Sequence, residues 1–173
     1  MAASSDEETW NPGSDDILTH FKTLDEQHRS LPSTHPDIAK SLNSIAGVYY
    51  RLGKYGASLK YFQDSLEMYR EIWPRENHPD IAATLSNIGL VCAAQGNFEL
   101  ALKFNQEALQ MHRECLPDNH PIIGRSIMNV TDSYLKLEMF KEAGEVLAQP
   151  SARLRAKGKK AAEKKKKYKK KRR

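Results

Sequence analysis

Three histidines recur at nearly constant spacing and are the first candidates for chemistry. His35, His78 and His120 each precede a proline, and they lie 43 and 42 residues apart in the sequence. Histidine is a frequent metal ligand and general base, but the ligands of one ion must converge on it. Because one histidine falls in each repeated segment, we expect neighbouring histidines to be on the order of 10 Å apart. We therefore predict that each histidine caps a helix whose first turn contains the proline.

No other pattern in the sequence is typical of catalysis. It contains no P-loop, no glycine-rich dinucleotide turn, no CxxC pair and no HExxH motif. The two cysteines, Cys92 and Cys115, fall at apolar positions of the repeat, so we predict small core residues rather than a disulfide or a metal pair. We predict a protein that is not an enzyme, with no catalytic residues, no metal site and no cofactor.

The elements that carry the histidines are paired helices. Residues 35–77, 78–119 and 120–149 align as three repeats, and in the first repeat Ile38, Leu42, Ile45 and Tyr49 recur at helical steps. A second apolar series of the same kind follows the glycine at position 53. Each repeat is therefore predicted to be two antiparallel helices joined by a tight turn. The turns are assigned to positions 53, 96 and 138, occupied by Gly53, Gly96 and Glu138.

A half repeat over residues 14–34 precedes the first full repeat. Ile17, Leu24 and Leu31 match Leu102, Leu109 and Leu116 at a constant offset of 85 residues. The segment is therefore predicted to be a lone second helix. The predicted fold is all-α, a right-handed solenoid of antiparallel helix pairs with about seven helices, in a repeat domain over residues 14–149.

The repeat resembles the tetratricopeptide repeat. The residues that carry the resemblance are large, small and aromatic positions on the first helix and small positions on the second: Leu42, Ile45, Ala46, Tyr49, Leu85, Ile88, Gly89, Cys92, Ser58, Ala101 and Ala143. The 42-residue period is similar to that of kinesin light chains and nephrocystin-like proteins. The resemblance covers residues 15–149 and implies a non-catalytic scaffold or adaptor that binds a peptide in a concave groove. A kinesin light chain-like cargo or microtubule-linked adaptor is the more specific function that it implies.

In the family that the chain resembles, the inner faces of the first helices line this groove. Mapping that face onto this sequence predicts the peptide-binding residues Lys40, Asn43, Ser44, Tyr50, Arg51, Asn87, Leu90, Arg125, Asn129, Asp132 and Lys136. The amides can pair with a peptide backbone, and the cations favour a peptide that carries carboxylates. The alternative is that these are ordinary solvated side chains on helix surfaces.

Charge divides the chain into an acidic body and a basic tail. Residues 153–173 contain 14 Lys or Arg and one Glu, whereas the other residues have a net charge of −8. We predict that residues 150–173 are disordered because like charges repel. As an alternative function, this tail binds a polyanion such as nucleic acid, tubulin tails, anionic lipid or a nuclear import receptor. The residues assigned to this role are Lys164, Lys165, Lys166, Lys167, Lys169, Lys170, Lys171, Arg172 and Arg173.

The terminal segments give three further expectations. Residues 1–13 are acidic, predicted to be disordered, and lack the features of a signal peptide, so we expect a cytoplasmic protein, with cytoskeletal or nuclear location as alternatives. Trp10 follows acidic residues, which suggests that this segment could occupy the groove of its own or another copy. Pro150 interrupts the last helix without a polar capping helix after it, so the exposed solenoid end predicts self-association or a partner contact.

Overall fold

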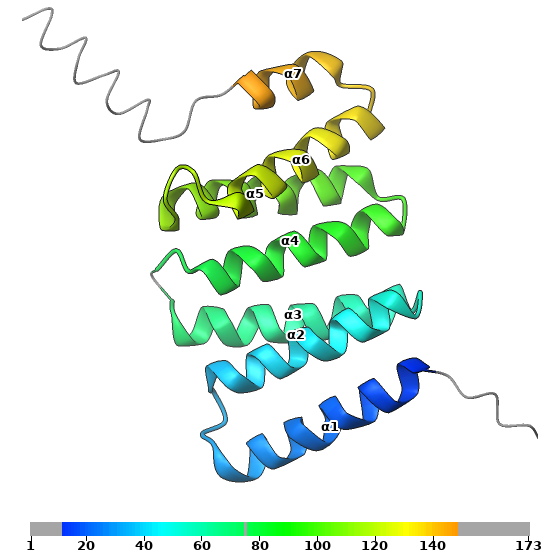
Figure 1. Ribbon diagram of the computed structural model, residues 1–173, viewed down its shortest axis with the longest axis vertical. Helices are drawn as coiled ribbons and strands as arrows, with labels where there is room; N and C mark the ends of the chain where they lie inside the picture. Colours follow the sequence, from blue (N-terminus) through cyan, green and yellow to red (C-terminus); the bar gives the residue numbers. More distant parts are fainter. Residues whose placement is uncertain (1–11, 75, 149–173) are drawn as a thin grey trace, which may run out of the picture. The chain divides into compact units, whose positions relative to one another are not determined.

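The computed structural model describes residues 12–74 and 76–148, which form seven helices and no strands (Figure 1). It divides into two compact units, Met1–Ile72 and Trp73–Arg173, which are described separately. The described helices of the first unit are α1 (Pro12–Ser30), α2 (Pro36–Arg51) and α3 (Tyr55–Ile72). Those of the second unit are α4 (Pro79–Ala94), α5 (Phe98–Cys115), α6 (Pro121–Lys136) and α7 (Phe140–Ala148). None of the described helices is long and apolar enough to cross a membrane.

The recurring histidines cap the first helix of each pair, which confirms the structural role predicted for them. Nδ1 of His35 accepts a hydrogen bond from the backbone N–H of Asp37, and His78 does the same for Asp80, both at 3.2 Å. His120 accepts from Ile122 at 3.3 Å. In each case proline occupies the first helical turn, where its missing N–H leaves no hydrogen bond unmade.

Helices within the first unit pack antiparallel through small side chains. Ser58 and Ser65 of α3 are buried and donate to the carbonyl oxygens of Ala46 and Ala39 of α2, at 2.8 and 2.7 Å. The pairing runs in opposite directions along the two helices, as expected for neighbours joined by a short turn. Small residues at these contacts let the two backbones approach closely.

The two units contain apolar clusters that correspond residue by residue at an offset of 85. In the first unit Leu24, Ile38, Leu42 and Ile45 are buried together. In the second unit Leu109, Ile123 and Val130 are buried at the positions that match Leu24, Ile38 and Ile45, and Ile127 packs against them at the position of Leu42. The clusters join a second helix to the following first helix, so the half repeat α1 relates to α2 as α5 relates to α6.

A polar bond also recurs at this offset. Ser41 donates to Oε1 of Gln27 at 2.7 Å in the first unit. In the second unit Nδ1 of His112 lies 2.8 Å from the hydroxyl oxygen of Ser126. Both bonds link the second helix of one pair to the first helix of the next, and His112 is only 2 % exposed.

The tightest helix contact of the second unit lies between α4 and α5. A Cβ atom added to Gly89 would lie 2.8 Å from Cγ of Asn105, a separation that real Cβ atoms essentially never show. Asn105 is buried, and its Nδ2 donates to Oγ of Ser133 at 3.1 Å and to the carbonyl oxygen of Asn129 at 3.4 Å. Asn105 is therefore wedged between Gly89 of α4 and the polar groups of α6.

The turns within the three helix pairs share one backbone conformation. Gly53 and Gly96 follow the ends of α2 and α4 with φ values of 70° and 80°, as predicted. Glu138 takes the same place after α6 with φ 58°, in a region that side chains with a Cβ rarely adopt. The third turn therefore keeps the geometry of the others at the cost of backbone strain.

Replacing Glu138 with glycine is expected to raise the free energy of unfolding by roughly 1 kcal/mol, because glycine adopts positive φ without steric strain. The measurement is urea denaturation followed by circular dichroism. Gly53→Ala is the matched control and is expected to lower stability by a similar amount. Equal stability of wild type and Glu138→Gly would show that the turn carries no strain.

The two cysteines differ in their surroundings. Cys92 is 1 % exposed and belongs to the core, as predicted, and burial raises the pKa of its thiol. The prediction was wrong for Cys115, which is half-buried at the end of α5 and donates through Sγ to the carbonyl oxygen of Asn77 at 2.7 Å. The last turn of α5 meets the loop before α4, so this apolar repeat position faces a loop backbone rather than the core.

Candidate peptide-binding surface

The predicted groove residues fall mainly on one row of each first helix. The rows step by four, three and four residues, so each follows a single helix face. We call these rows the inner rows, and they consist of Lys40, Ser44, Gly47 and Arg51 on α2; Ala83, Asn87, Leu90 and Ala94 on α4; and Arg125, Asn129, Asp132 and Lys136 on α6. None of these side chains is fully buried.

The inner row of α2 is polar and partly engaged within its own unit. Lys40 and Arg51 are exposed, and a guanidinium nitrogen of Arg51 lies 3.6 Å from a carboxylate oxygen of Asp16 on α1. Because both partners are more than half exposed, this ion pair contributes little to stability. The hydroxyl of Ser44 donates to the carbonyl oxygen of Lys40 at 3.1 Å. Lys40 therefore remains a positive charge on an accessible helix face.

Two predicted groove residues lie away from this row. The amide of Asn43 donates to Oγ of Ser65 and, at 3.4 Å, to the carbonyl oxygen of Ala39, so it faces α3 and links the helix pair. The ring of Tyr50 packs against that of Tyr55 at a centroid distance of 5.7 Å, next to the turn. Tyr50 is 36 % exposed and Asn43 is half-buried, so neither shares the face of Lys40 and Ser44.

The inner rows of α4 and α6 belong to neighbouring helices of the second unit, which contact each other directly. Asn87 and Asn129 occupy equivalent positions and are half-buried, and the structure gives their side-chain amides no hydrogen-bond partner among the described residues. Leu90, one turn further along α4, is 40 % exposed. Two amides and one apolar side chain are therefore available on adjacent helices.

Charge on this surface comes from α6. Arg125, Asp132 and Lys136 are all exposed and spaced along one face, so the row is positive at both ends and negative in between. An extended peptide that crosses α4 and α6 would meet the amides first and the cations at the edge. The arrangement suits hydrogen bonding to a backbone and ion pairing with carboxylates, as at other recognition surfaces.

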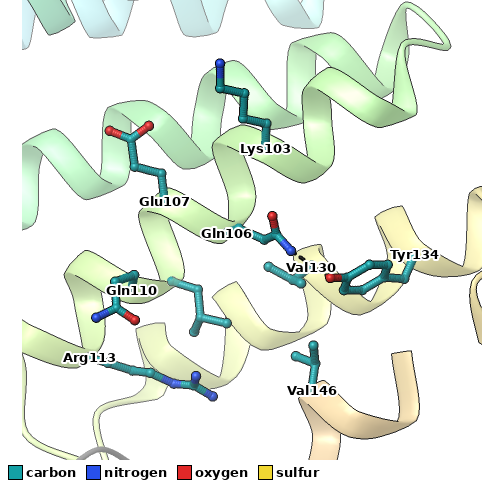
Figure 2. Close-up of a pocket in the computed structure, with 9 residues that line it drawn as sticks. Lys103, Gln106, Glu107, Gln110, Arg113, Val130, Tyr134 and Val146 are labelled. Carbon is teal, nitrogen blue, oxygen red and sulfur yellow. Dashed lines mark hydrogen bonds between the residues drawn. The ribbon is translucent and has the colours of Figure 1, made fainter. Parts of the chain in front are cut away.

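The analysis of sequence missed two features of the second unit. The first is a set of large apolar side chains that are exposed on and after α6, namely Met128, Leu135, Met139, Phe140 and Leu147. The second is a surface pocket of about 490 Å³ where α5, α6 and α7 meet, shown in Figure 2. Its lining from α5 is polar, whereas Leu109, Val130 and Val146 are apolar. Comparing positions 106 and 146 with positions 21 and 61 would have revealed it, because two aromatic residues are replaced there.

The predictions for the ends of the chain concern residues outside the described part. These are Trp10 in the acidic N-terminal segment and the polyanion-binding residues of the tail, from Lys164 to Arg173. They remain predictions from sequence.

Comparison with known proteins agrees with this architecture. A family model described as tetratricopeptide repeat matches residues 15–71 and 75–152, and no curated protein sequence matches the chain. Among solved structures, the nearly identical TPR-like repeats of a Podosopora anserina protein assigned as a kinesin light chain superpose with a TM-score of 0.70 at 18 % identity, over 78 % of this chain and 63 % of that one. BtubC (BKLC) from P. vanneervenii gives 0.71 at 16 % identity, over 88 % of this chain and 58 % of that one.

A Rap protein complexed with competence and sporulation factor is a third match, with a TM-score of 0.68 at 18 % identity, over 78 % of this chain and 36 % of that one. At these identities the structural matches establish the fold, and the chain spans less than two thirds of each of these proteins. The all-α solenoid fold predicted from the repeat is confirmed. The helix pairs, their caps and the family match together show that the chain belongs to the tetratricopeptide repeat family, of the kinesin light chain-like type.

Proposed function

We propose that this chain is a non-catalytic scaffold that binds a peptide segment of another protein across the inner rows of α4 and α6. The observation that carries the proposal is the pair of equivalent amides, Asn87 and Asn129, which stand side by side in sequence register on contacting helices without a hydrogen-bond partner among the described residues. Half-buried amides are costly to leave unpaired. A bound peptide backbone supplies both a donor and an acceptor for each of them.

The charges around the amides define the preferred ligand. Arg125 and Lys136 flank Asn129 on α6, and Lys40 occupies the position equivalent to Arg125 on α2. A peptide with carboxylates beside its central residues would gain ion pairs with these cations. The solved complex of the Rap protein with its factor supports a ligand-binding role for such repeats. The kinesin light chain-like relatives support cargo binding linked to the cytoskeleton, and hence a cytoplasmic location.

The test begins with selection of peptides from a random display library on the full chain. Affinity of the selected peptide is then measured by fluorescence polarisation. Asn129→Ala is expected to weaken binding about tenfold, because loss of a hydrogen bond to a peptide backbone costs about 1–1.5 kcal/mol. Arg125→Glu is expected to weaken an acidic peptide by a similar or larger factor, and the loss should shrink as salt is added.

The matched control for Arg125→Glu is Lys141→Glu, an equal change of charge on the exposed surface of α7. It should leave the affinity within twofold. Binding that tolerates both Asn129→Ala and Arg125→Glu would contradict the proposal. Far-UV circular dichroism must be unchanged in each variant, so that unfolding is not mistaken for lost contacts.

A second candidate function is favoured by the charge of the C-terminal segment, with 14 cations and one carboxylate in residues 153–173. In this alternative the segment binds a polyanion and the repeats act as a spacer. Binding to duplex RNA or to heparin should then weaken steeply with salt, because released counterions drive it. Replacement of Lys164 to Lys167 with glutamine should abolish that binding and leave peptide capture by the repeats intact.

A further inference from the structure

The pocket between α5, α6 and α7 lies in a place that is filled in the other unit. The offset of 85 residues pairs its lining with known positions: Leu109 and Val130 match Leu24 and Ile45, which form the floor in both units. Tyr134 of the pocket matches Tyr49. The floor and one wall are therefore alike, and the difference lies in what stands on them.

Three large side chains fill this place in the first unit. Tyr61 of α3 stacks on Tyr49 with centroids 5.4 Å apart, and Phe21 meets Tyr61 edge-on at 6.1 Å. Met68, seven residues after Tyr61, packs against the same cluster. An aromatic pair with a thioether beside it is a well-packed apolar filling.

The second unit lacks this filling. Val146 stands at the position of Tyr61 and Gln106 at that of Phe21, so two rings are absent. Nε2 of Gln106 donates instead to the phenolic oxygen of Tyr134 at 2.7 Å, as the dashed line in Figure 2 shows. In addition α7 has 9 residues in the described structure, whereas α3 has 18, so no described helix covers the part of α5 near Leu109 and Arg113.

The residues that follow α7 in this chain do not reproduce the missing half of α3. At the same offset Pro150 stands at the position of buried Ser65, where a proline would break the helix. Arg153 stands at the position of Met68. Lys103 and Arg113 on the pocket lining outnumber its single carboxylate, Glu107, which disfavours a basic segment and favours an acidic one.

We propose that this pocket docks a helix of a partner protein, in the way that the second half of α3 covers the first unit. The partner helix is amphipathic. It presents an aromatic side chain to Tyr134 and Val146 and, about two turns along, a Met or Leu side chain to Leu109. Acidic residues on its flanks lie near Lys103 and Arg113. This site is separate from the inner rows, and its failure would leave the peptide-binding proposal intact.

The structure itself supplies the probe. A fluorescein-labelled peptide with the sequence of residues 59–72, LKYFQDSLEMYREI, contains Tyr61, Met68 and three carboxylates. It is titrated with the full chain and followed by polarisation. A peptide with Tyr61→Ser and Met68→Ser is expected to bind at least tenfold more weakly. Isolated helices of this length are marginal in water, so titration should extend to millimolar protein.

Variants of the full chain then locate the site. Gln106→Phe with Val146→Tyr restores the filling of the first unit and should weaken the peptide at least tenfold. Leu147→Tyr is the matched control, since Leu147 is 62 % exposed beside the pocket residue Val146, and it should change affinity less than twofold. If the double variant does not fold, Gln106→Phe alone should weaken binding at least threefold.

Three results would overturn the proposal. Undiminished binding to the filled variant, or no binding at millimolar concentration, would show that the pocket does not dock such a helix. A tenfold gain in affinity on Leu154→Asp would show that the chain's own following segment is the occupant. Wild type that is dimeric in sedimentation, with a monomeric filled variant, would assign the pocket to a second copy.

Discussion

Gly89→Ala is expected to lower the free energy of unfolding by about 2–3 kcal/mol, through overpacking in a rigid contact. The new methyl group would collide with the side chain of Asn105, whose Cγ would be only 2.8 Å away. That side chain cannot swing aside freely, because it is 3 % exposed and hydrogen-bonded to Ser133. Relief of the collision would break this buried bond or move α4 away from α5.

The measurement is thermal unfolding by circular dichroism, with an expected fall in Tm of roughly 5–10 °C. Gly124→Ala is the control, because a Cβ there meets nothing within 4 Å and alanine favours the helix. It should leave stability equal or raise it. A Gly89→Ala, Asn105→Ala double variant should lose less than the sum of the single losses, because the second change removes the atoms with which the methyl collides. Additive losses would refute the steric explanation.

Acid is expected to destabilise the fold through His112. Burial, and then the charge of nearby His120, lower the pKa of His112 in the folded protein. The unfolded chain therefore binds a proton at His112 before the folded chain does. Stability from this residue is complete above the unfolded pKa near 6.5 and declines as the pH falls through that value towards the lowered folded pKa. The slope for one proton is at most about 1.4 kcal/mol per pH unit.

The physical reason lies in the two ring nitrogens. Nδ1 is bonded to Ser126, whereas Nε2 is buried without a partner among the described residues. Protonation would place a charged N–H at Nε2 where no acceptor is available. His112→Gln is the appropriate variant, because Gln27 forms the equivalent bond with Ser41 in the first unit.

Urea denaturation of both proteins between pH 7 and pH 5 measures the effect. Wild type should lose stability relative to His112→Gln across this range, and the difference should follow the titration of one group. Parallel curves would show that His112 does not titrate differently on folding. Comparison with the variant removes the contribution of carboxylates, which the two proteins share.

Sequence alone was sufficient for the repeat, the helix count and the helix ends. Apolar residues at three- and four-residue steps determine which face of each helix is buried. Histidine before proline and glycine after the last turn act within a few residues of the positions they control. Such local effects leave their pattern in the sequence, and the caps at His35, His78 and His120 agree with it.

Contacts between helices could be decided only by the tertiary structure. Asn43 belongs to the predicted groove by its spacing, yet its amide turns to Ser65 on the neighbouring helix. The same holds for the wedge of Asn105 against Gly89, and for the pocket left by Val146 and Gln106. These features depend on the size and hydrogen bonds of residues that are distant in sequence. Periodicity records which side of a helix is covered, whereas the volume that remains between helices appears only when their side chains are packed together.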